Sequence, residues 1–472
     1  MLKKEPFTLF LLAVLASIPL LFGARHPLIQ GGYSFLLLVC CGGWLMLNSG
    51  QLPAGLVNSK TMLIAALLCL ILATSFSLPL FSLQILSPVR ANFLLKAEKI
   101  LEVNPTTALS YYAPGTRFHA VYLTALLLCF LCATALLRKD YRLTAALWVI
   151  MGVGTIEAVY GLLQAMNPSL GVLWLPSQVG AEGCARGTII YRNQYAAFLN
   201  MCWPMSLALG LTLSRQGNVN SGQGKNAKES LALAQQISQG FKKATLPVLA
   251  SAFMILAVIL SRSRGGIVVM VLIVALLLFL LPSTRRTKGL TGGAFLLFIL
   301  LYGGMIGLRQ VADRFLFFYD SARDRFELWR DSLAILKDHL LTGIGLGSYQ
   351  FLSPVYLRKV PGNAWYDYAH NEYVELAIEL GLPLMLLFLV WICWGLGKHG
   401  ARIIEVTRQT GALMDIADKD IVAIGAFCGI VGLLLHGFVD FIWRLPVNSF
   451  YAVMLLAMLS VATAHEQTDE SQ

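Results

Sequence analysis

Apolar runs of about 18–20 residues recur along this 472-residue chain, and each is long enough to cross roughly 30 Å of hydrocarbon as a helix. Hydrophobic residues make up 57% of the chain and charged residues only 13%, and the mean hydropathy is +0.69. A soluble domain of this length needs far more charge to cover its surface. The sequence therefore predicts an all-α protein that spans a lipid bilayer many times and has no nucleic-acid partner.

The apolar runs predict twelve membrane spans. They lie near residues 7–23, 31–48, 62–80, 119–137, 143–165, 194–213, 245–261, 265–282, 290–308, 373–397, 421–440 and 446–463. No small-residue cleavage site follows Phe7–Phe22, so a first span is favoured over a cleavable signal peptide. An even number of spans places both termini on one side of the membrane.

Lysine and arginine predict the cytoplasmic side, because short cytoplasmic loops carry an excess of both. Of the 36 such residues, 18 lie on the side of the N-terminus and 18 on the other side. Twelve of the latter fall in two long loops, 81–118 and 309–372, where the rule is weak. The short loops therefore divide 18 to 6, and we expect both termini in the cytoplasm.

Two turns on the outer side hold arginines in tight surroundings and are candidate anion sites. Gly183–Thr188 precedes Tyr191–Asn193 at the sixth span, and Ser261–Gly266 joins two spans with almost no loop. Glycines let a backbone approach a ligand closely, and arginine offers phosphate a planar fork. The simpler interpretations are a glycine-rich turn and interfacial anchors. The strongest candidates for phosphate contact are Arg186 and Arg264, beside Arg192 and Arg262.

The largest polar segment, residues 309–372, lies between the ninth and tenth spans. Its stretch 324–336 has apolar residues at helical spacing, which predicts an amphipathic helix on the outer surface. The face is expected to consist of Phe326, Trp329, Leu333 and Leu336. The glycines within Gly343–Gly347 follow no predicted strand and precede no P-loop lysine, so they are not assigned to a nucleotide loop.

His370 lies at or just before the start of the tenth span, where this polar loop meets the membrane. The positive end of a helix disfavours imidazolium and so keeps imidazole usable as a base near pH 7. A helix-capping or hydrogen-bonding histidine is the simpler interpretation. His339 and His436 are predicted to be structural.

Glu157 and Asp440 fall within or at the end of predicted spans, where an unpaired carboxylate is costly. Each is expected to pair with one of the outer arginines. Of the nine cysteines, only Cys184 lies in a polar loop. The Cys40–Cys41 and Cys129–Cys132 pairs lack neighbouring histidine or charge, so small buried side chains are favoured over a metal site.

In order and type, these motifs resemble the O-antigen ligase and Wzy-type polymerase superfamily. The similarity rests on Arg186–Thr188 with Asn193, Ser261–Gly266, Trp329 with Gly343–Tyr349, and Ala369–Leu376 running into Glu379–Pro383. It covers roughly residues 140–400 as a catalytic core, flanked by four spans in 1–139 and by two spans with an acidic tail in 401–472. One departure is His339, where the family usually has proline.

The resemblance implies a metal-independent, inverting glycosyltransferase without a cofactor, acting in lipopolysaccharide or exopolysaccharide assembly. Its donor would be a glycan on undecaprenyl pyrophosphate, and its acceptor either lipid A–core or a second lipid-linked glycan. Arg186 and Arg264 would hold the pyrophosphate, and His370 would remove the acceptor proton. Supporting contacts would come from Arg192, Arg262, Asn193, Asn371, Arg330 and Glu375. Other polysaccharide-assembly proteins are expected partners.

Two questions stay open from the sequence. A transporter or flippase of lipid-linked oligosaccharide would also need arginines for pyrophosphate, although it should place charges near the bilayer midplane. A membrane scaffold fits the arginine-rich outer loop less well. Ligase and polymerase share the motifs, and only the outer loop 81–118 leans toward polymerases of exopolysaccharide systems.

Overall fold

The computed structural model describes residues 5–53, 55–102, 106–173, 175, 183–216, 227–290, 292–293, 297, 318–358, 365–413 and 415–464. Over these residues the chain is helical and forms no strand, as the sequence predicts. The helices are α1 (Pro6–Leu20), α2 (Pro27–Leu47), α3 (Ser59–Ala73), α4 (Leu80–Leu86), α5 (Pro88–Leu101), α6 (Ala113–Leu136), α7 (Asp140–Met166), α8 (Arg192–Gln216), α9 (Ala227–Leu260), α10 (Arg264–Leu280), α13 (Phe318–Asp338), α14 (Tyr349–Tyr356), α15 (Glu372–Leu380), α16 (Leu382–Gln409), α17 (Asp418–His436) and α18 (Pro446–Ala462), with short 3-10 turns at Phe22–Ala24 and Ser49–Gln51.

Among the described residues, seven helices are long and apolar enough to cross a membrane: α2, α6, α7, α8, the second half of α9, α16 and α17. Four shorter apolar helices, α1, α3, α10 and α18, overlap other predicted spans. The predicted span 290–308 lies almost entirely outside the described residues. The multi-pass character is thus confirmed, whereas the count of twelve stays a prediction.

The predicted tenth span, 373–397, is two helices rather than one. Gly381 separates α15 from α16 and has a φ of 78°, a left-handed conformation that glycine adopts easily. A Cβ at this position would lie 2.6 Å from the carbonyl oxygen of Leu341. The candidate span is Leu382–Gln409, so α15 precedes it as a separate short helix.

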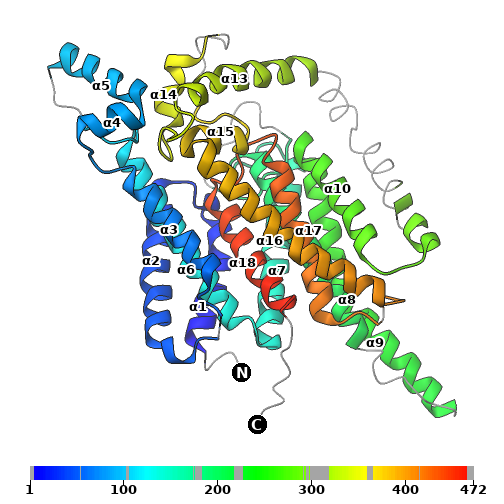
Figure 1. The fold of residues 1–472 in the computed structure, drawn as a ribbon. Coiled ribbons are helices and arrows are strands. Elements are labelled where there is room, and N and C mark those ends of the chain that lie inside the picture. Colours follow the sequence, from blue (N-terminus) through cyan, green and yellow to red (C-terminus); the bar gives the residue numbers. More distant parts are fainter. Residues whose placement is uncertain are drawn as a thin grey trace.

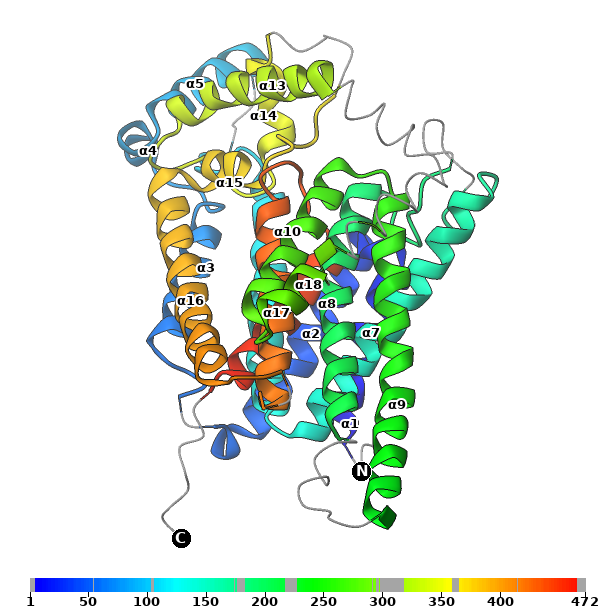
Figure 2. The ribbon, with the colours of Figure 1, turned by 90° about the vertical axis from the view of Figure 1, so that its right-hand side faces the viewer.

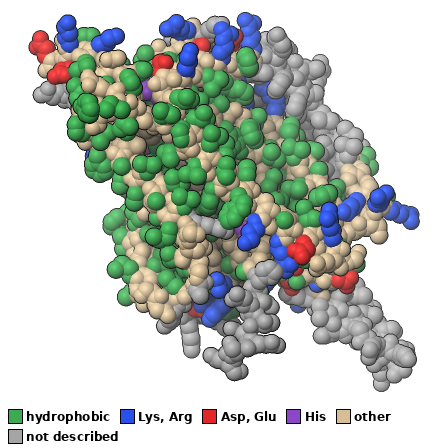
Figure 3. Space-filling model, viewed as in Figure 1, with side chains coloured by type: hydrophobic (Ala, Val, Ile, Leu, Met, Phe, Trp, Pro, Cys, Tyr) green, Lys and Arg blue, Asp and Glu red, His purple; other side chains and the backbone are tan. Residues whose placement is uncertain are grey.

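The apolar helices run side by side along one direction, while α4, α5, α13 and α14 gather at one end (Figures 1 and 2). The start of α1 and the end of α18 lie at the opposite end (Figure 1). Hydrophobic side chains cover much of the flank in Figure 3, and lysines and arginines collect towards the two ends. This distribution is typical of a bundle whose flank faces lipid and whose ends face water.

The core is centred on α8, whose candidate span is 83% buried. Its largest fully buried side chains are Tyr195, Phe198 and Trp203. They belong to a single buried cluster with Leu15 of α1 and Phe450 of α18. This core crosses the expected segment boundaries near residues 139 and 400, which stay predictions.

The amphipathic helix in the polar loop is α13, but only half of the expected apolar face packs inward, since Leu336 lies against a buried cluster and Trp329 is half-buried. Phe326 is 63% exposed and Leu333 48% exposed, whereas Leu328, Ser332 and Ile335 are buried. Ser332 faces inward because its Oγ lies 2.7 Å from the hydroxyl of Tyr349 at the start of α14. A hydrogen bond therefore compensates a polar side chain that the apolar spacing does not predict.

The glycine-rich turn after α13 is shaped by close packing. Gly343, Gly345 and Gly347 all have left-handed φ angles. A Cβ on Gly343 would lie 2.3 Å from the carbonyl oxygen of Glu379, and one on Gly345 would lie 2.4 Å from Ser110 Oγ. The turn thus brings the polar loop directly against α15 and the residues before α6.

Candidate active site

His370 stands immediately before α15, at the helix start that the sequence predicts. Asn371 caps the helix, since its side-chain oxygen accepts from the backbone N–H groups of Tyr373 and Val374 at 3.0 and 3.1 Å. The φ of His370 is 51°, in the left-handed region that non-glycine residues rarely adopt. A residue in this strained conformation needs support from its surroundings.

The imidazole of His370 meets a buried carboxylate from a distant part of the chain. Its Nδ1 lies 3.0 Å from Oδ1 of Asp440, which follows α17 and is 3% exposed. Asp440 also accepts from the backbone N–H of Phe441 at 2.9 Å and from the Asn193 side chain. Arg325 of α13 completes the environment, with Nη2 at 4.0 Å from Asp440 Oδ2.

The partners of Asp440 keep it ionised. Burial acts to raise the pKa of Asp440, but the hydrogen bond with His370, the charge of Arg325 and the Phe441 N–H lower it below its ordinary value. A carboxylate accepts from imidazole Nδ1–H, which leaves Nε2 as the nitrogen with a lone pair. The His370 ring packs edge-on against Phe441, with centroids 4.9 Å apart, and its side chain stays 32% exposed.

The turn between α9 and α10 places Arg262 and Arg264 at the end of the bundle. Ser263 caps α10 by accepting from the Gly266 N–H at 3.1 Å. Gly266 lies so close to Ala196 of α8 that a Cβ would approach it to 2.5 Å. The positive charges of Arg325 and Arg192 both act on Arg264, the first residue of α10.

The loop before α8 lies against this turn. Ala185 N–H donates to the carbonyl of Leu260 at 3.0 Å, and the guanidinium of Arg262 packs over Gly183. Arg186 is fixed through its backbone N–H, which donates to Gln164 Oε1 at 3.1 Å. Burial lowers the pKa of the Arg186 guanidinium below its ordinary value, and the charge of Arg192 acts in the same direction.

The structure corrects the expected partner of Glu157. Instead of an arginine, this buried carboxylate accepts from the Thr188 N–H at 2.8 Å and from the Thr188 hydroxyl at 2.6 Å. It therefore shapes the loop that carries Arg186. Asp440 lies beside an outer arginine, Arg325, as expected. The imidazole of His370 is closer to the Asp440 carboxylate, at 3.0 Å against 4.0 Å for Arg325.

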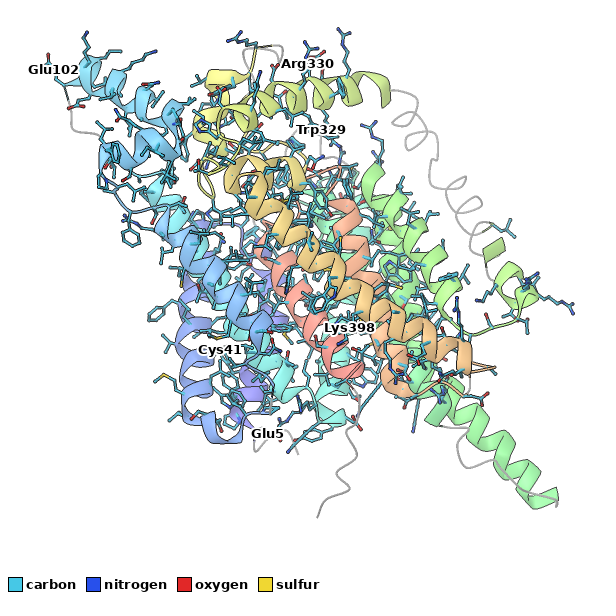
Figure 4. All side chains as sticks on the ribbon, in the orientation of Figure 1. Glu5, Cys41, Glu102, Trp329, Arg330 and Lys398 are labelled. Carbon is cyan, nitrogen blue, oxygen red and sulfur yellow. The ribbon has the colours of Figure 1, made fainter. Side chains whose placement is uncertain are left out.

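Two of the expected site residues take other positions. Glu375 lies one turn into α15. Its side chain accepts from the backbone N–H of Ala369, the residue before His370. Arg330 lies on the exposed side of α13 and pairs with Glu327 at 3.6 Å. In Figure 4 its side chain points away from the bundle, while Trp329 points inward.

The two other histidines differ in their surroundings. His339 is buried, with Nδ1 at 3.3 Å from Ser87 Oγ and Nε2 at 3.2 Å from the Tyr111 hydroxyl, and burial lowers its pKa to about 4. It therefore joins α13 to the segment around α5, as a structural histidine does. His436 is buried at the end of α17 against Gly265.

A second charged cluster lies next to His370 and was not predicted. Arg444, in the loop before α18, contacts Glu372 at 3.7 Å, Glu375 at 3.2 Å and Glu379 at 2.7 Å. All three carboxylates belong to α15 and are at most 1% exposed. The spacing of three and four residues was a visible signal, because it places them on one helix face.

Over the described part of the chain, no group of three or more His, Cys, Asp or Glu side chains has an arrangement that fits a metal ion. The carboxylates of α15 are directed at Arg444 instead.

The fold and the site define a multi-pass helical membrane protein with a histidine–carboxylate pair and several arginines at one end. Residues 249–389 match the O-antigen ligase family, so the chain contains an O-antigen ligase domain and the resemblance seen in the sequence is confirmed. The match runs from α9 into α16 and includes Arg264, Arg325 and His370. It supports a glycosyltransferase-type function and an inner-membrane location. A search of curated proteins found no match.

Proposed function

We propose that this protein moves a glycan from an undecaprenyl-pyrophosphate donor to an acceptor hydroxyl on the outer side of the inner membrane. The observation that carries the proposal is the 3.0 Å hydrogen bond between His370 Nδ1 and Asp440 Oδ1, beside arginines in a chain with an O-antigen ligase domain. A pyrophosphate-linked donor already contains its leaving group. One base and a set of cations are therefore sufficient chemistry for transfer.

His370 acts in this proposal as the general base. With Nδ1–H donated to Asp440, Nε2 takes the proton of the acceptor hydroxyl as the hydroxyl oxygen bonds to the anomeric carbon. The Asp440 carboxylate stabilises the imidazolium that forms. Attack opposite the departing pyrophosphate inverts the configuration of the anomeric carbon.

The arginines act on the leaving group. As the bond between the anomeric carbon and the pyrophosphate oxygen breaks, the electron pair goes to the pyrophosphate. Arg186 and Arg264 offer it bidentate, charge-assisted hydrogen bonds, with Arg192 and Arg262 nearby. The arginines supply the positive charge in this scheme, and no metal ion or cofactor takes part.

The site is proposed to face the periplasm. It lies at the end of the bundle that carries α13 and α14, opposite the start of α1 and the end of α18 (Figures 1 and 2). The excess of lysine and arginine in short loops favours a cytoplasmic position for those termini. A flippase is the weaker alternative, because it would bind its cargo near the bilayer midplane.

Incubation of the purified protein with lipid-linked repeat units tests this function. We expect glycan transfer by the wild type and none by a His370→Ala variant that inserts normally in the membrane. Lipid A–core is added in a second arm. Chain extension without core identifies a polymerase, and transfer that requires core identifies a ligase. Wild-type transfer by the variant would contradict the proposed base.

A further inference from the structure

Both backbone polar groups of Ala369, the residue before His370, are hydrogen-bonded to side chains. Ala369 is fully buried, and its N–H donates to Oε2 of Glu375 at 2.8 Å. Its carbonyl accepts from the indole Nε1 of Trp329 at 2.8 Å. The two partners come from different helices, α15 and α13, and together they hold the two peptide groups that flank the Cα of Ala369.

Glu375 is itself anchored in the Arg444 cluster. Arg444 Nε lies 3.2 Å from Glu375 Oε1, and its Nη2 lies 2.7 Å from Glu379 Oε2. The buried Glu375 side chain keeps its orientation because turning it away would separate it from Arg444 inside the protein. The acceptor for Ala369 is therefore rigid.

The same cluster reaches the loop that carries Asp440. Glu372 Oε1 accepts from the Trp443 N–H at 2.6 Å, and Arg444 lies four residues after Asp440 in the same loop. In the other direction, Glu372 N–H donates to the carbonyl of Gly437 at 2.9 Å. The cluster that supports His370 therefore also supports the loop that carries Asp440.

We propose that Trp329 and Glu375 are positioning residues, which clamp the backbone on both sides of the Ala369 Cα and so keep His370 in the left-handed conformation that brings Nδ1 to Asp440. A histidine prefers other backbone conformations when it is unrestrained. Loss of either hydrogen bond lets the 369–370 backbone relax and moves the imidazole off the carboxylate. This inference rests on the proposed base function of His370.

Trp329→Phe is the most informative variant, because it keeps an aromatic ring while it removes the pyrrole half of the indole with its N–H donor. We expect kcat for transfer to fall about tenfold, the effect of one hydrogen bond, with KM for the lipid-linked donor unchanged. Leu333→Ala, at an exposed position on the same helix, is the control and should behave as wild type.

Glu375 supplies an independent test through two substitutions. Glu375→Gln keeps an oxygen that accepts from Ala369 and should retain most of kcat, whereas Glu375→Ala should lose about as much as Trp329→Phe. If Glu375→Ala does not fold, Trp329→Phe and Glu375→Gln decide. Wild-type kcat in Trp329→Phe would overturn the clamp, and so would a fall in kcat of about tenfold or more in Glu375→Gln. Activity of His370→Ala would instead overturn the base function itself.

Discussion

Two charged regions lie side by side at one end of this protein, with opposite ratios of arginine to carboxylate. In one, Arg325 contacts Asp440, and Arg264 experiences the charges of Arg325 and Arg192. In the other, Arg444 contacts three buried glutamates of α15. The first region is suited to an anionic ligand, whereas in the second the charge of Arg444 is already met by glutamates.

The two regions also differ in how far their side chains are exposed to solvent. In the arginine-rich region the side chains are partly exposed, as 32% for His370 and 37% for Arg325 show. In the glutamate-rich region every member is at most 12% exposed, and the carboxylates bond to backbone N–H groups. We infer that substrates meet the first region and that the second holds it in shape.

The largest effect is expected for His370→Ala. Loss of a general base typically costs about 10²–10⁴-fold in rate, so transfer should fall below detection while membrane insertion and thermal stability are retained. The measurement is transfer of a labelled lipid-linked glycan by equal amounts of purified wild type and variant. Residual transfer above about a tenth of wild type would assign the base to another group.

Arg444→Leu should separate the two regions by stability. Removal of one partner from a buried ion cluster leaves uncompensated carboxylates and costs about 3–5 kcal/mol. We expect a large fall in the thermal unfolding midpoint in detergent, which Arg444→Lys restores in part. Arg264→Leu is the matched control and should leave the midpoint near that of the wild type. Equal thermal unfolding midpoints for Arg444→Leu and Arg264→Leu would contradict the view that the glutamate-rich region supports the fold and the arginine-rich region does not.

Arg264→Lys and Arg186→Lys should weaken donor binding rather than folding. A charge-assisted hydrogen bond contributes about 1.5–3 kcal/mol, so KM for the donor should rise roughly tenfold to a hundredfold. Steady-state kinetics over a range of donor concentrations measures the change. Unaltered KM in either variant would remove that arginine from the proposed pyrophosphate site.

The smallest effect is a pH dependence of stability from the glutamate-rich region. Burial raises the pKa of Glu372 to about 7 and of Glu375 to about 8, against the opposing charge of Arg444, from an ordinary value of 4.5. Because the folded state holds these protons more tightly, the contribution of these two groups to stability is fully present below pH 4.5 and is lost as pH rises to about 8. Thermal scans at several pH values should show this decline, and Glu375→Gln should flatten it. An increase in stability across this window would contradict the assignment.

The sequence predicts the membrane class well because composition and the length of apolar runs determine it directly. It also locates His370 at a helix start and the two arginine turns, since each motif is local. It does not predict the partner of His370, because Asp440 is 70 residues away and the pair depends on how the α17–α18 loop folds back. The available signal was that an unpaired Asp440 carboxylate at the end of a span is costly. That signal predicted an arginine partner and did not point to His370.

Other failures have the same origin in tertiary contacts. Glu157 pairs with Thr188 because the loop after Gly183 folds down onto α7, which spacing along the chain does not reveal. The buried face of α13 includes Ser332 because Tyr349 lies opposite it. Apolar periodicity assigns such a residue to the surface, since it cannot include a partner from another helix.

Asp440→Asn tests the central claim most directly. The substitution keeps the size of the side chain and removes the charge that orients His370 and stabilises its protonated form. We predict that kcat for glycan transfer falls about a hundredfold or more while KM for the donor and the thermal midpoint stay near wild type. A variant that transfers glycan at the wild-type rate would contradict the account.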